Sequence, residues 1–234
     1  MSRGDGVQLN LLKSYGMDYR QAYQLQRELL TLRQKGEIED TLFLTSHPHV
    51  ITIGRAGSRD NLLVSEAFLQ TRRIQVVPIE RGGDITYHGP GQIVGYPIIN
   101  LGCFEKDLHL YVYRLEQMII DLLQDYEINA GRIEGLTGVW VGNEKIAAIG
   151  IAVSKWVTWH GFALNVAPSL SYFNYIIPCG ISDKGVTSLQ KILGREISNE
   201  EVEGKLIEKF KHQFGYSRVE EIKAGMLGKG GKSA

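Results

Sequence analysis

The chain has 234 residues, of which 43% are hydrophobic and 22% charged, and its formal net charge is zero. A full core can form from this composition, and the length favours one mixed domain over two small ones. The balanced charge gives no indication of a nucleic acid or an anionic membrane surface as partner. Two cysteines, Cys103 and Cys179, are too few for a secreted disulfide scaffold.

Targeting and metal signals are missing from the sequence. The first ten residues carry Arg3 and Asp5 but no apolar stretch, so they do not resemble a signal peptide. No apolar run approaches the length of a membrane span. Histidine and cysteine are not clustered as metal ligands are. We therefore expect a soluble cytoplasmic protein without a bound metal.

The first half of the chain alternates between one helix and several short strands. Asp18 suits an N-cap and Gly36 a stop, which predicts a helix between them. Pattern and turn residues then predict strands at residues 41–45, 74–80 and 93–99, a loop at 47–61, and glycine-rich breaks at 81–84 and 88–91.

The second half begins with the clearest helix, for which Asp107 is the expected N-cap and apolar residues recur at three- and four-residue spacing. A hairpin is predicted over residues 139–153, followed by a strand over 157–166. Capping signatures at Thr187 and Ser198 predict two final helices, the first ending at Gly194. Strands and helices do not alternate regularly, which favours an α+β fold: a mixed sheet with flanking helices.

Residues 81–92 hold four glycines, one proline, Arg81 and His88 directly after a predicted strand. Glycines let the backbone turn with positive φ and let a ligand approach closely, and Arg81 and His88 would supply a charge or a donor. The alternative is a plain glycine-rich turn. Neither the P-loop nor the G-x-G-x-x-G pattern is present.

Lys145 begins an apolar strand directly after a tight turn. It is either a solvated lysine at a strand end or a lysine that faces a cavity. A desolvated lysine beside another titrating group can act as an acid or a base. In the following strand, Gly161 and Ala163 alternate with bulky residues, so one face is flat enough for a chain-like ligand or a packed neighbour.

Cys179 lies between Pro178 and Gly180 in an irregular segment. A free cysteine is usually a small buried hydrophobe, which is our reading of Cys103. In a nucleophilic role Cys179 would need a nearby cation to favour the thiolate, and the Gly180 N–H would lie near an oxyanion. Several histidines could partner it (His47, His49, His88 and His160), and no spacing selects among them.

Taken together, these segments resemble the lipoyl(octanoyl) transferase family. The most specific match is Arg81-Gly82-Gly83 followed by residues 86–92. The other matching stretches occur in the family's order at residues 47–55, 135–150, 160–165 and 178–189. The resemblance covers roughly residues 15–215.

The resemblance implies a fold shared with biotin- and lipoate-protein ligases, in which a mixed sheet and flanking helices surround a tunnel. We expect a single acyltransferase domain over residues 1–234, with an ordered core at about 15–215 and a flexible tail at 225–234. The implied reaction moves an octanoyl group from octanoyl-acyl carrier protein to a specific lysine of apo lipoyl domains, the first step of endogenous lipoate assembly. The implied acceptors are the lipoyl domains of 2-oxoacid dehydrogenase complexes and the glycine cleavage H protein.

The resemblance also implies roles for individual residues. Cys179 would be the acyl-thioester nucleophile, and Lys145 would lower its pKa and carry protons. Ala148 stands where many relatives have serine, and Asp84 occupies a variable place. The residues implied for substrate binding are Arg81, Gly82, Gly83, Asp84, Ile85, Thr86, Tyr87, His88, Ala148, Ile149, Gly150, Gly161, Phe162 and Ala163.

No cofactor is expected, because a thioester donor already carries an activated acyl group. The expected enzyme is a monomer. Three alternatives stay open: an ATP-dependent ligase on the same fold, a cysteine hydrolase that releases free acid, and a non-catalytic acyl-binding module. Transfer from the thioester donor without ATP would exclude the ligase, and transfer to an added lipoyl domain would exclude the hydrolase. Loss of transfer in variants at Cys179 and Lys145 would exclude the binding module.

Overall fold

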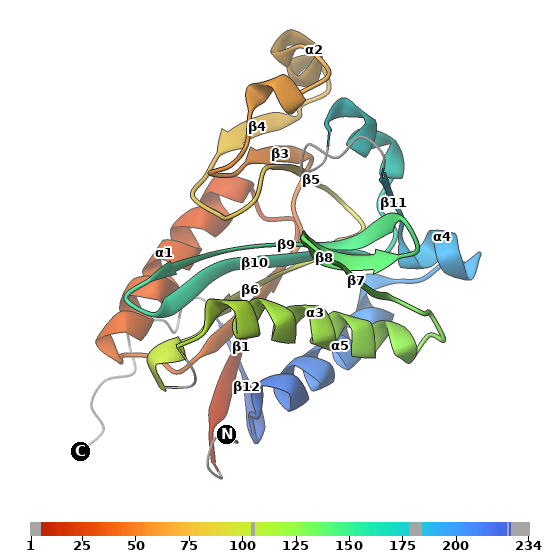
Figure 1. The fold of residues 1–234 in the computed structure, drawn as a ribbon. Helices are drawn as coiled ribbons and strands as arrows, with labels where there is room; N and C mark the ends of the chain where they lie inside the picture. The colour runs from red at the N-terminus through yellow and green to blue at the C-terminus, as the bar shows by residue number, and fades with distance from the viewer. Residues whose placement is uncertain (1–5, 104–105, 178–183, 224, 226–234) are drawn as a thin grey trace.

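The computed structural model describes residues 6–103, 106–177, 184–223 and 225. Within these residues a mixed nine-stranded sheet forms the centre of the molecule, and a three-stranded sheet lies beside it (Figure 1). The main sheet has the order β12 (Arg218–Ile222), β1 (Gln8–Ser14), β2 (Thr41–Thr45), β6 (Gln92–Ile98), β10 (Val157–Asn165), β9 (Glu144–Ser154), β8 (Leu136–Val141) and β7 (Gly131–Ile133), with β11 (Gly185–Val186) on β9. The small sheet has the order β4 (Gln75–Pro78), β3 (Val50–Ile53) and β5 (Ile85–His88).

Helices cover both faces of the main sheet. Figure 1 shows α3 (Leu108–Gln124) and α5 (Asn199–Phe214) together on one face and α1 (Tyr19–Lys35) on the other. The shorter helices are α2 (Glu66–Thr71) and α4 (Leu189–Leu193), and three 3₁₀ turns span Arg59–Asn61, Leu101–Cys103 and Leu170–Tyr175. This architecture confirms the predicted α+β class.

Local capping explains why the long helices begin and end where predicted. The Asp18 carboxylate accepts hydrogen bonds from the N–H groups of Arg20 and Gln21, and Gly36 ends α1 in the left-handed conformation at φ 74°. Asp107 caps α3 and Ser198 caps α5 in the same way. These caps confirm the three long helices predicted from sequence.

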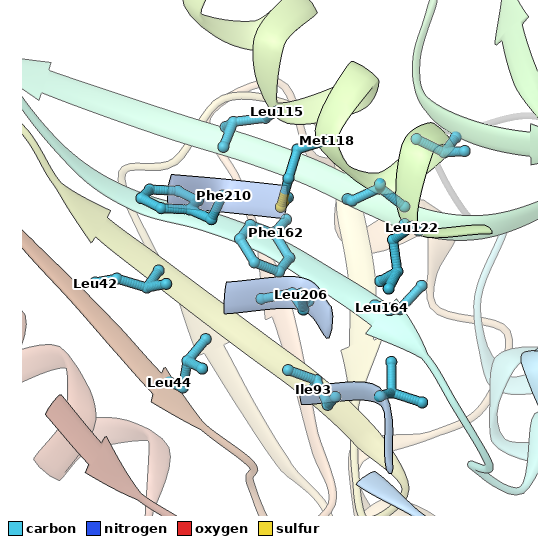
Figure 2. Packing of buried hydrophobic residues seen from close by; sticks show 14 of the residues in the cluster. Leu42, Leu44, Ile93, Leu115, Met118, Leu122, Phe162, Leu164, Leu206 and Phe210 are labelled. Atoms are coloured by element: carbon cyan, nitrogen blue, oxygen red, sulfur yellow. The ribbon is translucent and has the colours of Figure 1, made fainter. Parts of the chain in front are cut away.

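The largest core lies between the main sheet and the α3–α5 pair. Phe162 and Leu164 of β10 pack there against Met118 of α3 and Leu206 of α5 (Figure 2). Each such side chain contributes about 1.5–3 kcal/mol when it leaves water. Because strand residues alternate in direction, the small residues of β10, such as Ala163, face the opposite side. That side is where the sheet leaves room for a cavity.

Some local predictions were wrong. The segment 47–61 contains β3, and the glycine-proline segment 85–92 begins with β5, because these short apolar runs are paired by tertiary contacts with β4 and with each other. The cap of α4 is Ser188, whose side chain accepts from the Lys191 N–H, rather than Thr187. Strands β1, β7, β11 and β12 and helix α2 were not predicted, and Cys103, which we expected to be a buried hydrophobe, is exposed.

Within the described residues, none of the helices combines the length and the apolar character that crossing a membrane requires.

Candidate acyl-transfer site

A cavity lies along the β9–β10 surface, below the small sheet. Its walls come from α1, β5, β6, β9, β10, β11, the loop that precedes β5 and the 3₁₀ turn Leu170–Tyr175. The residues that line it are Tyr19, Arg81, Gly83, Asp84, Ile85, Thr86, His88, Gln92, Val94, Tyr96, Lys145, Ala148, Ile149, Gly150, His160, Gly161, Phe162, Ala163, Asn165, Phe173 and Val186.

Arg81 is buried at the edge of this cavity, where its side chain donates several hydrogen bonds to Thr52 and Gly82. Its guanidinium donates to the carbonyl and the hydroxyl of Thr52 at 2.8 and 2.9 Å, and to the Gly82 carbonyl at 3.1 Å. A guanidinium stays charged under all ordinary conditions. The site therefore contains a fixed positive charge held in place by β3.

The glycines of this segment allow two loops to meet. Gly54 donates its N–H to the Asp84 carbonyl at 2.9 Å, and a Cβ at Gly54 would stand 2.3 Å from the Gly83 carbonyl oxygen. The Asp84 carboxylate accepts from the Asn61 side chain at 2.5 Å. The loop is thus built into the small sheet, and a plain surface turn is the wrong description of it.

Strand β9 makes the second set of contacts with the glycine-rich loop at Gly82. The Gly82 N–H donates to the Ile151 carbonyl at 2.8 Å. A Cβ on Gly150 would stand 2.8 Å from the Gly82 carbonyl oxygen and 3.1 Å from Arg81 Cδ. A residue with a side chain at position 150 would push the loop off the sheet, which accounts for glycine there.

Lys145 is buried at the cavity, with 7% of its surface exposed. Its Nζ lies 4.7 Å from the centroid of the Trp140 ring, a cation–π arrangement. Its backbone carbonyl accepts from the Thr187 N–H at 3.0 Å, and it pairs with Val186 of β11. Of the two readings of Lys145, the structure shows the lysine that faces a cavity.

A buried carboxylate holds the backbone at Gly138, against which the Lys145 side chain lies. Glu116 of α3 accepts from the Gly138 N–H at 3.0 Å and from Arg132 Nε at 2.8 Å. Gly138 has φ 129°, and a Cβ there would stand 3.3 Å from Lys145 Cε and 2.7 Å from the Ala147 carbonyl oxygen. The lysine stem can lie against this backbone only because position 138 has no side chain.

Cys179, the predicted nucleophile, lies outside the described residues. The described residues on either side of it are both anchored. Ile177 donates its N–H to the Asn61 carbonyl at 2.8 Å, while Lys184 Nζ donates to the Asn143 side chain at 3.0 Å. The chain therefore leaves from the loop that follows β3 and returns at the turn just before Lys145.

A buried amide network joins the strand ends near Lys145. The Asn165 side chain accepts from Gln92 Nε2 at 2.8 Å and donates to the Thr187 carbonyl at 2.9 Å. Gln92 in turn accepts from the Gly89 N–H at 3.2 Å. This network ties β10, the end of the glycine-rich segment and the start of α4 together.

Three buried histidines surround the cavity wall nearest α1. Burial lowers the pKa of His47 to about 4, and burial together with the charges of Arg81 and Arg55 lowers that of His160 to about 3. Burial also places the pKa of His88 well below its ordinary value. All three are neutral at pH 7, since burial penalises the charged form.

The structure brings most of the predicted binding residues to one place. Twelve of the fourteen line the cavity; Gly82 and Tyr87 do not. Tyr87 instead packs in the core of the small sheet, where its hydroxyl bonds to His49 at 2.7 Å. Sequence reasoning did not include several lining residues in the site: Tyr19, Gln92, Val94, Tyr96, His160, Asn165, Phe173 and Val186.

Among residues 6–103, 106–177, 184–223 and 225, no group of three or more His, Cys, Asp or Glu side chains could hold an ion.

Comparison with known proteins identifies the family. The family model of the lipoyl protein ligase A/B catalytic domain matches residues 18–211. The chain belongs to this family. Its relatives include an octanoyltransferase of Caldicellulosiruptor saccharolyticus, 51% identical over 211 residues, which cover 89% of this chain and 90% of that protein. An octanoyltransferase of Solibacter usitatus is 52% identical over 203 residues, 87% and 91% of the two chains.

Solved structures share the fold of this family member. Lipoate-protein ligase A bound with ATP superimposes with a TM-score of 0.73 at 17% identity, over 95% of this chain and 92% of that one. A bipartite lipoate protein ligase from Thermoplasma acidophilum gives 0.69 at 15% identity, over 95% and 90%. These structures confirm the predicted fold, and the octanoyltransferase relatives confirm the predicted acyltransferase class.

Proposed function

We propose that this octanoyltransferase family member takes an octanoyl group from octanoyl-acyl carrier protein and passes it to a lysine of an apo lipoyl domain, through a thioester on Cys179. The natural acceptors are the lipoyl domains of 2-oxoacid dehydrogenase complexes and the glycine cleavage H protein. The relatives' shared activity supports the octanoyl group and the transfer. The carrier-protein donor, the acyl-enzyme and a monomeric enzyme are parts of the proposal.

The observation that carries the proposal is the setting of Lys145. A lysine with 7% exposure at a cavity wall is rare unless a neighbour or a function holds it there. Strand β11, which follows the Cys179 segment after one intervening residue, pairs with Lys145 through Val186. Because the chain pairs with Lys145 only a few residues after Cys179 in the sequence, this contact supports a shared role for the two side chains.

The chemistry balances with these two groups alone. The Lys145 ammonium favours the Cys179 thiolate, which attacks the donor carbonyl; the carrier thiol leaves with a proton from Lys145. The acceptor amine then attacks the new thioester, and its proton returns to Lys145 as the cysteine thiolate leaves. The cavity shields the acyl group from water, so transfer outcompetes hydrolysis.

The apolar parts of the cavity suit an aliphatic chain. Val94, Ala148 and Ala163 all line it. Each methylene moved from water into such a surface contributes about 0.8 kcal/mol.

The test is a transfer assay without ATP. Purified enzyme is incubated with octanoyl-acyl carrier protein and apo lipoyl domain, and the mass of the domain is followed. We expect one octanoyl group on its lysine. Strict dependence on ATP would refute the proposal in favour of a ligase, and free octanoate with unmodified domain would refute it in favour of a hydrolase.

A matched pair of lysine variants assigns the role of Lys145. Lys145→Met keeps the stem and removes the charge, so we expect transfer to fall by at least about a hundredfold, in the range of lost acid–base catalysis. Lys191→Met removes an exposed lysine of α4 that pairs with Glu144, the residue before Lys145 in β9, and full activity is expected. Equal rates for the two variants would contradict the assignment.

A further inference from the structure

The cavity continues along β10 beyond the length that an octanoyl chain needs. Asn165 stands near Lys145, and Gly161 and His160 follow four and five residues further along the same strand. At about 3.3 Å per residue these positions lie roughly 13 and 17 Å from Asn165. Seven C–C bonds of about 1.5 Å give an extended octanoyl group a length of only about 9 Å.

The far end is closed by polar groups instead of apolar ones. His160 lines the cavity with 1% of its surface exposed, and neither ring nitrogen has a hydrogen-bond partner among the described residues. The Tyr96 hydroxyl, by contrast, is occupied by His47 Nε2 at 2.8 Å. Buried polar atoms without partners are uncommon and indicate a ligand or water site.

His160 adopts a backbone conformation that residues with a side chain rarely adopt. Its φ of 55° is unusual for a residue with a side chain, and its ring stacks on Trp159 with centroids 4.2 Å apart. The backbone N–H of His160 donates to the Gln26 side chain of α1 at 2.9 Å. Strand β10 therefore departs from regular geometry at the residue that closes the cavity, and such departures gather at functional sites.

We propose that His160 forms a polar end to the acyl cavity and thereby sets the length of the acyl chain that the enzyme transfers. The inference rests on the proposed function, since it takes the Lys145 end as the reacting end. An octanoyl methyl group stops short of His160 and leaves its nitrogens hydrated. A longer aliphatic chain would strip that hydration without offering a hydrogen bond in return, which is costly. A chain of the same length with a terminal hydroxyl would meet the nitrogens with a partner.

The first experiment needs only the natural chain. Carrier protein is loaded with octanoyl, decanoyl, dodecanoyl, 10-hydroxydecanoyl or 12-hydroxydodecanoyl groups, and kcat/KM is measured for transfer to the lipoyl domain. We expect at least about a tenfold preference for the ω-hydroxylated dodecanoyl group over the plain one, the factor that one buried unsatisfied polar group costs. Equal rates for the two, or a preference for the plain chain, would overturn the inference.

Two variants then locate the effect. His160→Phe keeps a ring for the Trp159 stack but removes both nitrogens, so the ratio of dodecanoyl to octanoyl kcat/KM should rise by about tenfold and the hydroxyl preference should vanish. His160→Asn keeps polar atoms and tolerates positive φ, so the hydroxyl preference should persist. Unchanged ratios in a folded His160→Phe enzyme would refute the role of His160.

These outcomes separate the two proposals. If the natural enzyme transfers no octanoyl group at all, the proposed function has failed. If it transfers octanoyl but treats plain and hydroxylated long chains alike, only the polar end has failed.

Discussion

Removal of the Glu116 carboxylate tests whether α3 holds in place the Gly138 backbone that contacts Lys145. Glu116 is 7% exposed and bridges two partners, the Gly138 N–H and Arg132. Glu116→Ala leaves the N–H of Gly138 without its acceptor in a buried place. The same change releases the backbone against which the Lys145 stem lies.

The size of the effect follows from these two contacts. A hydrogen bond to a charged group is worth about 1.5–3 kcal/mol. The Arg132 pair adds little, about 0.5 kcal/mol, because that side chain is 28% exposed and screened by solvent. We therefore expect a loss of about 2–3.5 kcal/mol. For a chain of this size each kcal/mol shifts Tm by about 2–4 °C, so the melting temperature should fall by about 4–14 °C.

The assay combines thermal unfolding with octanoyl transfer measured well below the lower Tm. Glu116→Gln keeps an acceptor for Gly138, so it should lose less than half as much stability and retain more activity than Glu116→Ala. Glu208→Ala removes an exposed carboxylate on α5, 70% exposed, and should change Tm by no more than about 1–2 °C. If Glu116→Ala matches the Glu208 variant in both Tm and rate, the support of Lys145 by α3 is refuted.

Three further outcomes are expected. Since the folded-state pKa of His47 is about 4 and that of His160 about 3, both below the unfolded value of about 6.5, the unfolded chain binds more protons below that value. The stability that these histidines contribute is thus complete above pH 6.5 and falls as the pH drops, by about 1.4 kcal/mol per unit for each histidine. Between pH 7.5 and 5, urea unfolding should therefore show that the His160→Asn variant loses about 2 kcal/mol less stability than the wild type. Equal losses would contradict the burial argument. Asn165→Ala breaks two buried hydrogen bonds and should cost about 2–4 kcal/mol by urea unfolding, whereas a change under 1 kcal/mol would refute the network's importance. Gly150→Ala should displace the loop at Gly82 and reduce transfer at least tenfold, and an unchanged rate would show that the loop need not touch β9.

Local signals predicted the elements that local chemistry determines. Asp18 and Gly36 delimit α1 because their side-chain acceptor and positive φ act within a few residues. The alternation along β10 likewise predicted one flat face, and Gly161 and Ala163 do line the cavity. The family resemblance supplied the identity of the reaction, which neither periodicity nor composition could supply.

The rest depends on contacts between distant segments. Strand β1 pairs with β12 more than two hundred residues away, and no local pattern marks either as a strand. The unpredicted wall of the cavity joins Tyr19 at the start of α1 to His160 in β10. His160 in particular attracted attention only as one of several histidines, because its unusual φ and unpartnered nitrogens exist only in the folded chain.

The most direct test of the account is the mass of the enzyme after incubation with octanoyl-acyl carrier protein in the absence of an acceptor. We predict a gain of one octanoyl group, mapped by peptide analysis to Cys179, released by hydroxylamine and transferred when apo lipoyl domain is added. Cys179→Ser should give neither a transferable adduct nor product at the natural rate. Rapid transfer by an enzyme that never carries the octanoyl group would contradict the central claim.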